Sequence, residues 1–184
     1  QDYPNIEYII IDGASTDGTV DIIKKYADRI SYWISEPDKG LYYAMNKGIE
    51  VATGDWMHIH NAGGVFASKN AISQFFSNNL ENVDAAFGYI YSKSTKRKER
   101  NPIPFYECKG KMMRPGYSHQ ALFIRSHWMK NHPFDVSYRC CADFNQAVTI
   151  YRQGAKFKYV DVYIYISAPA GFSANNRRTQ FIEN

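Results

Sequence analysis

The stretch IEYIIIDGASTDGT, residues 6–19, decides the fold class of this chain. Its apolar first half is rich in β-branched residues and ends in a carboxylate, which predicts a buried parallel strand that delivers Asp12 at its carboxyl end. The GASTDGT cluster after it is typical of a turn in which Thr16 or Asp17 caps a helix over residues 19–26. A strand, a turn and a helix in this order indicate an α/β domain.

The rest of the chain continues this alternation. Short apolar runs predict strands at residues 30–35, 56–60, 85–92, 121–125 and 157–166, and helical periodicity predicts helices at residues 41–52, 68–78 and 142–152. No repeat or linker interrupts them, so we predict one domain over residues 1–184 with a mostly parallel sheet flanked by helices. Ligands bind such sheets at the carboxyl ends of the strands, where Asp12 and Asn61 are expected.

Composition excludes two classes of protein. With 45% apolar and 22% charged residues the chain is not disordered, and no apolar run reaches the roughly 20 residues that span a bilayer. Its three cysteines, of which Cys140 and Cys141 are adjacent, do not form the even pattern of a disulfide framework. This favours reduced thiols and a cytoplasmic location, with peripheral binding at the inner face of the membrane as an alternative.

Positive charge is concentrated in the run KSTKRKER, residues 93–100, within a chain whose net charge is only +4. The run is either a solvated loop or a patch that faces anionic phosphate or a membrane. We expect no nucleic acid as partner, because the run lacks interleaved aromatic residues and no recognised binding motif is present.

Four stretches carry a more specific resemblance: YPNIEYIIIDGASTDGT, SEPDKGLYYAMNKGIEVATGDW, HQALFIR and CADFNQAVTIYRQGAKFKYVD. In this order they resemble the landmarks of the large inverting glycosyltransferase family with the GT-A fold, often called family two. The resemblance implies a nucleotide-sugar-dependent transferase of bacterial cell-surface polysaccharide biosynthesis, built on the Rossmann-like GT-A sheet.

The first landmark implies contacts to the nucleotide. In the family, the carboxylate at the place of Asp12 contacts the uracil, and the alternative is a carboxylate that only caps a turn or helix. Ser15 either contacts the ribose or caps the helix that follows it.

The second landmark borders the nucleotide pocket in the family. Asp38, Lys39 and Gly40 precede a helix whose amino end attracts a diphosphate, and Asn46 follows within that helix. The alternative is a surface turn followed by an ordinary amphipathic helix.

The last two landmarks imply the chemistry. A carboxylate at the place of Asp143 is the general base of the family and takes the proton of the acceptor hydroxyl. The residue-based alternative is a carboxylate paired with the dipole of a helix start. His119, in the family's His-Gln pair, lies near the acceptor or the donor phosphates, and the alternative is a histidine satisfied within the core.

Two departures from the family pattern stand out. The acidic motif that binds a divalent cation, usually Mn²⁺ or Mg²⁺, falls at residues 61–64, which read NAGG, so Asn61 is left to bind ribose or phosphate. The metal ligands are therefore unknown. His58 and His60 are a remote alternative, and Lys39, Arg114 or Arg125 offer phosphate neutralisation without metal.

The second departure is that the first strand and helix of the family are absent from the given sequence. We expect an open strand edge as a result, which invites a homodimer or a strand-swapped assembly. The function predicted from the whole sequence is inverting transfer of a sugar from a nucleoside diphosphate donor, UDP first, to a saccharide or lipid-linked acceptor. The rival is a catalytically silent domain that binds nucleotide sugar or a partner enzyme.

Overall fold

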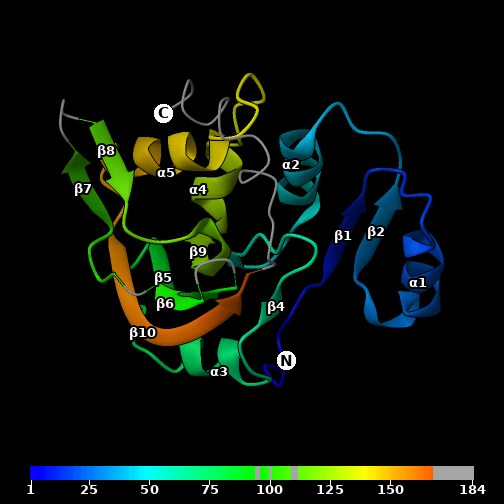
Figure 1. The fold of residues 1–184 in the computed structure, drawn as a ribbon, viewed down its shortest axis with the longest axis horizontal. Coiled ribbons are helices and arrows are strands. Elements are labelled where there is room, and N and C mark those ends of the chain that lie inside the picture. Colours follow the sequence, from blue (N-terminus) through cyan, green and yellow to red (C-terminus); the bar gives the residue numbers. More distant parts are fainter. Residues whose placement is uncertain (94–95, 100, 109–111, 168–184) are drawn as a thin grey trace.

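The structure is a computed structural model that describes residues 1–93, 96–99, 101–108 and 112–167, with the backbone alone at 106–108 and 112–115. Its strands fall into separate sheets (Figure 1). β1 (Ile9–Asp12) and β2 (Tyr32–Ser35) form a parallel pair, and α1 (Thr19–Lys25) and a short helical turn η1 (Ala27–Arg29) connect them. β1, the turn after it and α1 correspond to the strand, turn and helix that were predicted at the start of the chain.

A six-stranded sheet forms the centre of the molecule. Its order is β3-β9-β5-β10-β4. β6 lies outside this order and pairs with the last residues of β5. The strands are β3 (Trp56–Met57), β4 (Val65–Phe66), β5 (Ala85–Ser92), β6 (Arg97–Glu99), β9 (Leu122–Arg125) and β10 (Phe157–Ile166). A hairpin of β7 (Phe105–Cys108) and β8 (Met112–Pro115) stands beside it.

The sheet is mixed, which refines the expected mostly parallel arrangement. Among the described strands, β1 runs parallel to β2 and β5 runs parallel to β10, whereas β3–β9, β5–β9, β4–β10 and β5–β6 are antiparallel. A parallel pair needs a long crossover, usually through a helix. The chain from β5 to β9 returns through strands and a single helical turn, so β9 runs antiparallel to β5. The predicted α/β fold with flanking helices is confirmed.

Helices cover both faces of the central sheet (Figure 1). α4 (Ser126–Asn131) and α5 (Ala142–Arg152) lie on one face, and α3 (Ala71–Phe76) lies on the other. Alternate residues of β5 serve the two cores: Phe87 packs in the first, and Ala86 and Ile90 pack in the second. This alternation is the expected period of a strand buried on both faces.

α2 (Leu41–Val51) connects the two sheets, because it contacts β1 on one side and α4 on the other. Its buried residues Tyr42 and Ile49 join the core beneath α4 and α5. In the described part of the chain, β1 pairs with β2 alone and β3 pairs with β9 alone. α2 therefore helps to hold the β1–β2 pair against the central sheet, together with the hydrogen bonds that the Thr53 and Gly54 backbone N–H groups donate to Glu7.

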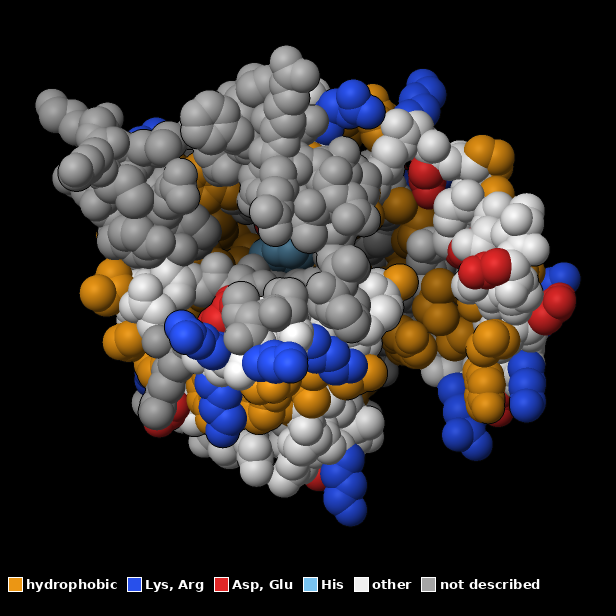
Figure 2. All heavy atoms as spheres, viewed as in Figure 1, with side chains coloured by type: hydrophobic (Ala, Val, Ile, Leu, Met, Phe, Trp, Pro, Cys, Tyr) orange, Lys and Arg blue, Asp and Glu red, His pale blue; other side chains and the backbone are white. Residues whose placement is uncertain are grey.

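Several predicted elements have the expected bounds, namely β5, β10 and α5. The sequence patterns predicted no strand between residues 93 and 120, but the described part of that stretch contains β6, β7 and β8. Figure 2 shows Lys and Arg side chains gathered over β6, whose residues are all exposed. The basic run is therefore partly a strand. Within the described residues, no helix is both long and apolar enough to cross a membrane.

Candidate active site

Asp143 lies where three elements meet. It is in the first turn of α5, and the Tyr42 hydroxyl from α2 donates to its Oδ1 at 2.8 Å. His119, from the helical turn η2 (His119–Ala121), places Nδ1 2.8 Å from Oδ2. The side chains of Asp143 and His119 keep exposures of 22% and 32%, so both are accessible to a ligand.

The environment of Asp143 favours its ionised form. Burial raises the pKa of this carboxyl, but the hydrogen bond from His119, together with donation by Tyr42 and the Phe144 amide, outweighs burial. The pKa therefore lies below the ordinary aspartate value. A carboxylate that is ionised at neutral pH and reachable from outside is suited to accept a proton.

Asn61 extends this hydrogen-bond network beyond His119. Its Nδ2 lies 3.1 Å from His119 Nε2, and the Tyr165 hydroxyl donates to the Asn61 carbonyl at 3.3 Å. The network assigns the imidazole proton to Nδ1, so that His119 donates to Asp143 and accepts from Asn61. The structure thus brings Asn61, His119 and Asp143 together. The predicted contacts of His119 and Asn61 with acceptor, phosphate or ribose stay predictions.

Asp12 sits at the carboxyl end of β1, as predicted, and is bound by its own surroundings. Ser15 donates its backbone N–H to Oδ2 at 2.9 Å and its hydroxyl to Oδ1 at 2.6 Å, and Ser35 donates its hydroxyl to Oδ2 at 2.6 Å. These hydrogen bonds from Ser15 and Ser35 lower the pKa of Asp12. The Ala14 backbone N–H adds a further hydrogen bond, so donors of the chain itself surround this carboxylate. Ser35 was not predicted, since only the β1–β2 register brings it to Asp12.

The loop at residues 36–40, which was predicted to border the sugar donor and is named the donor loop, is tied to α2 by charge. Lys47, one helical turn or more into α2, binds Glu36 at 2.6 Å and Asp38. Hydrogen bonds to Asp38 and Glu36 raise the pKa of Lys47. Asp38 Oδ2 is buried without a hydrogen-bond partner among the described residues and faces Gly13 of the first landmark. The two predicted donor landmarks are therefore neighbours in space.

Other predicted residues take different places. Lys39 is exposed beside this loop, and Gly40 immediately precedes α2. Asn46 exchanges two hydrogen bonds with the Phe134 backbone, at 2.8 and 2.9 Å, so the structure gives it a role in holding α2 to the segment after α4. Arg125 stacks over Trp56 and donates to the Val83 carbonyl, away from Asp143. The Arg114 side chain lies outside the described residues.

The turn at residues 61–64 does not fit a divalent cation. A side chain on Gly64 would overlap the hydroxyl of Tyr165, which is fully buried, and Gly63 has a left-handed backbone with φ of 84°. The described residues contain no group of three His, Cys, Asp or Glu side chains arranged to hold a metal ion. The side chains of this turn therefore offer no carboxylate ligand to a metal ion.

His58 and His60 are packing residues. His58 stacks on Phe123 at 4.5 Å and its Nδ1 contacts the Leu122 carbonyl, while burial lowers its pKa to about 4. His60 Nε2 contacts the Gly64 carbonyl at 3.1 Å. A neutral imidazole at His58 that is stacked in the core supports the structural alternative for this pair.

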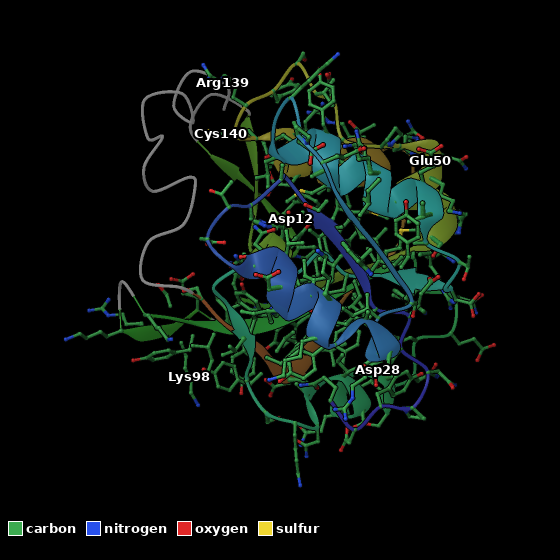
Figure 3. All side chains as sticks on the ribbon, turned by 90° about the vertical axis from the view of Figure 1, so that its right-hand side faces the viewer. Asp12, Asp28, Glu50, Lys98, Arg139 and Cys140 are labelled. Carbon is green, nitrogen blue, oxygen red and sulfur yellow. The ribbon has the colours of Figure 1, made fainter. Side chains whose placement is uncertain are left out.

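Figure 3 labels Asp12 and Cys140, one from each of the two groups of candidate residues. In Figure 3, Asp12 and Cys140, which precedes the helix of Asp143, lie in the upper half of the view, whereas Lys98 and Asp28 lie below. Tyr42, which donates to Asp143, is a further residue that sequence reasoning missed. Its signal was present, because it stands in the GLYYAMNKG segment that carried the resemblance.

Known proteins match both the sequence and the fold. A PGL/p-HBAD biosynthesis glycosyltransferase of Mycobacterium bovis is 26% identical over 147 residues, which cover 77% of this chain and 56% of the relative. An uncharacterized glycosyltransferase of Mycobacterium tuberculosis is 32% identical over 145 residues, which cover 75% of this chain and 54% of the relative. The chain thus spans about half the length of the curated relatives that it matches.

Solved structures support the same fold. S. aureus TarS 1-349 in complex with UDP-GlcNAc superposes with a TM-score of 0.73 at 15% identity, covering 93% of this chain and 52% of that one. The mannosyltransferase PcManGT from Pyrobaculum calidifontis, in complex with GDP-Man and Mn2+, gives 0.70 at 17% identity, covering 97% and 52%. The family described as glycosyl transferase family 2 matches residues 1–154. This chain therefore belongs to glycosyl transferase family 2.

Proposed function

We propose that this chain transfers a sugar from a nucleoside diphosphate donor to a hydroxyl of a saccharide or lipid-linked acceptor, with inversion at the anomeric carbon. The observation that carries the proposal is Asp143, an accessible carboxylate whose pKa is lowered and whose oxygens are both held by hydrogen bonds. Asp143 takes the acceptor proton, the acceptor oxygen bonds to the anomeric carbon, and the bond from that carbon to the diphosphate oxygen breaks. The nucleoside diphosphate leaves with the electron pair.

We propose UDP as the nucleotide. Asp12 is a carboxylate of lowered pKa at the carboxyl end of β1, which suits it to accept the N–H of a uracil ring. The UDP-GlcNAc bound to TarS supports this choice, and the GDP-Man bound to PcManGT is its main rival. Asp38, Lys39 and Gly40 border the diphosphate in this arrangement, next to the first turn of α2.

The experiment that tests the transfer combines a donor panel with a variant. UDP- and GDP-sugars are incubated with the protein and candidate acceptors, with and without manganese, and the anomeric configuration of the product is read by NMR. We expect transfer with inversion from a UDP-sugar and loss of transfer in Asp143→Asn. A product with retained configuration, or full activity in the variant, would contradict the proposal.

A second function is favoured by one observation. Tyr165 fills the space where a side chain on Gly64 would point, so no carboxylate is available there for a metal that neutralises the leaving diphosphate. A silent domain that binds nucleotide sugar would have this property. This silent-domain alternative predicts that calorimetry detects UDP binding, while no sugar donor in the panel is hydrolysed or transferred.

We also propose that an open strand edge recruits a further strand, from a second copy of the chain or from elsewhere in the protein. The support is that, in the described part, β1 pairs with β2 alone and β3 with β9 alone. Unpaired backbone N–H and C=O groups favour strand addition. Light scattering after size exclusion tests it, and a monomer at all concentrations would exclude the second copy.

A further inference from the structure

The Tyr42 hydroxyl contacts two oxygen atoms at the start of α5, where the proposed general base Asp143 lies. The hydroxyl lies 2.8 Å from Asp143 Oδ1 and 2.7 Å from the carbonyl oxygen of Cys140. Cys140 belongs to the loop that leads into α5, and Asp143 is in the first turn of that helix. One hydroxyl therefore holds both the side chain of the candidate base and the backbone that precedes it.

The ring of Tyr42 is anchored independently of its hydroxyl. It is 5% exposed, belongs to the core beneath α4 and α5, and packs against Phe134 at a centroid distance of 5.4 Å. α2 is fixed in turn by Asn46, which bonds to the Phe134 backbone, and by Lys47, which binds the donor loop. The hydroxyl thus has little freedom, and its position is set by α2.

We propose that Tyr42 is the positioning residue of the general base, holding the Asp143 carboxylate and the start of α5 in the arrangement that meets the acceptor hydroxyl. This inference rests on the proposed role of Asp143. Tyr42 does not itself touch the reacting atoms.

The electrostatics fit a donor role for Tyr42. Burial and the charge of Asp143 raise its pKa, so the phenol stays protonated at all working pH values. Its single proton faces two acceptors, and the ionised carboxylate is the stronger of them. Donation from Tyr42 therefore stabilises the base form of Asp143 and contributes to lowering its pKa.

The other groups around Asp143 act on the same titration. Among the described residues they are His119 from η2 and the buried Tyr117 that precedes η2, while Cys141, next to the start of α5, acts on Tyr42. His119 supplies a larger share of the lowering than Tyr42. Removing the Tyr42 hydroxyl should therefore move the titration of Asp143 without abolishing it.

The test is the pH–rate profile of Tyr42→Phe, which keeps the buried ring and removes the hydroxyl. We expect the acid limb of the kcat profile to move up by about one pH unit. We also expect kcat near neutral pH to fall about threefold to tenfold, with the donor KM unchanged. Tyr43→Phe is the matched control, because its exposed neighbouring ring has no contact to Asp143 among the described residues, and its profile should match the wild type.

A second probe keeps the proposal testable if Tyr42→Phe folds poorly. Site-specific replacement of Tyr42 by 3-fluorotyrosine keeps the hydroxyl and makes it a stronger donor, so the acid limb should move down, opposite to Tyr42→Phe. A merely structural hydroxyl would move neither limb. If Asp143→Asn is inactive and both Tyr42 replacements leave the acid limb in place, the positioning role is overturned while the proposed function stands. If Asp143→Asn is fully active, it is the base assignment that fails.

Discussion

Asp12 and Asp143 are both held carboxylates, but they are held in opposite ways. Asp12 is 7% exposed and its donors are Ser15 and Ser35, which belong to its own loop and to the neighbouring strand. Asp143 keeps 22% of its side-chain exposure, and its donors come from α2 and η2. The hydrogen bonds to Asp12 fix the conformation of its own loop, whereas those to Asp143 fix the orientation of an accessible carboxylate. The comparison predicts that Asp12 serves binding and Asp143 serves turnover.

The largest expected effect separates these two roles. Asp143→Asn removes the proton acceptor but keeps the shape of the side chain, so kcat should fall about a hundredfold or more while UDP affinity changes little. Steady-state kinetics and calorimetry on the same preparation measure both quantities. Asp12→Asn is the matched variant and should show the reverse pattern, with weaker UDP binding and nearly normal kcat for bound donor. Equal losses of kcat in the two variants would end the distinction.

The second prediction concerns the loop at Asp12. Asp12→Ala leaves Ser15 and Ser35 without their acceptor and a uracil N–H without its partner, so UDP binding should weaken by about 1–3 kcal/mol. Calorimetry with UDP measures it. Ser35→Ala is the control, because it removes a single donor and should cost less. If Asp12→Ala binds UDP as tightly as the wild type, Asp12 is only a structural carboxylate.

The difference between the two regions also explains what sequence reasoning reached. Asp12, its turn and the following helix are encoded within IEYIIIDGASTDGT, so strand, turn and ligand-facing edge were all predictable from local pattern. α5 and β10 were predicted at their observed bounds for the same reason, since each has a clear period. Local elements with local partners are the part of this fold that a single sequence defines.

The network around Asp143 was not predictable in the same way. Tyr42 and Asp143 are 101 residues apart, and nothing in the local pattern distinguishes Tyr42 from the neighbouring Tyr43. β6, β7 and β8 were missed because their residues are charged or mixed rather than alternating, and α4 because six residues are too few to display a helical period. The family resemblance identified Asp143 and His119, and only the tertiary structure shows that Tyr42 from α2 and His119 from η2 bind the Asp143 carboxylate.

The turn at residues 61–64, which contacts His119 through Asn61, gives the third prediction. Gly64 lies against the buried hydroxyl of Tyr165, so Gly64→Ala forces a shift in a packed core and should lower the free energy of unfolding by about 1 kcal/mol or more. Chemical denaturation measures it, with Gly154→Ala as a comparison at an open position where only the positive φ opposes the change. Gly64→Asp should suffer the same clash and gain no manganese-dependent UDP affinity. Such a gain without loss of stability would contradict the proposed obstruction.

The smallest expected effect is the acid dependence of stability. Asp12 and Asp143 both have pKa values below the ordinary 3.8 in the folded chain, so each stabilises the fold above that pH, and the contribution is lost as pH falls through the folded pKa. Hydrogen bonds from the serines lower the pKa of Asp12 more than burial raises it. For Asp143, burial is the largest single influence on the pKa, and it acts against the hydrogen bonds that lower the pKa. Replacing Asp12 should therefore flatten the acid-side loss of stability more than replacing Asp143 does. Denaturation of Asp12→Asn, Asp143→Asn and wild type between pH 3 and 7 measures the slopes. An equal or greater flattening in Asp143→Asn would mean that His119 and Tyr42 stabilise the ionised base more strongly than the serines stabilise Asp12.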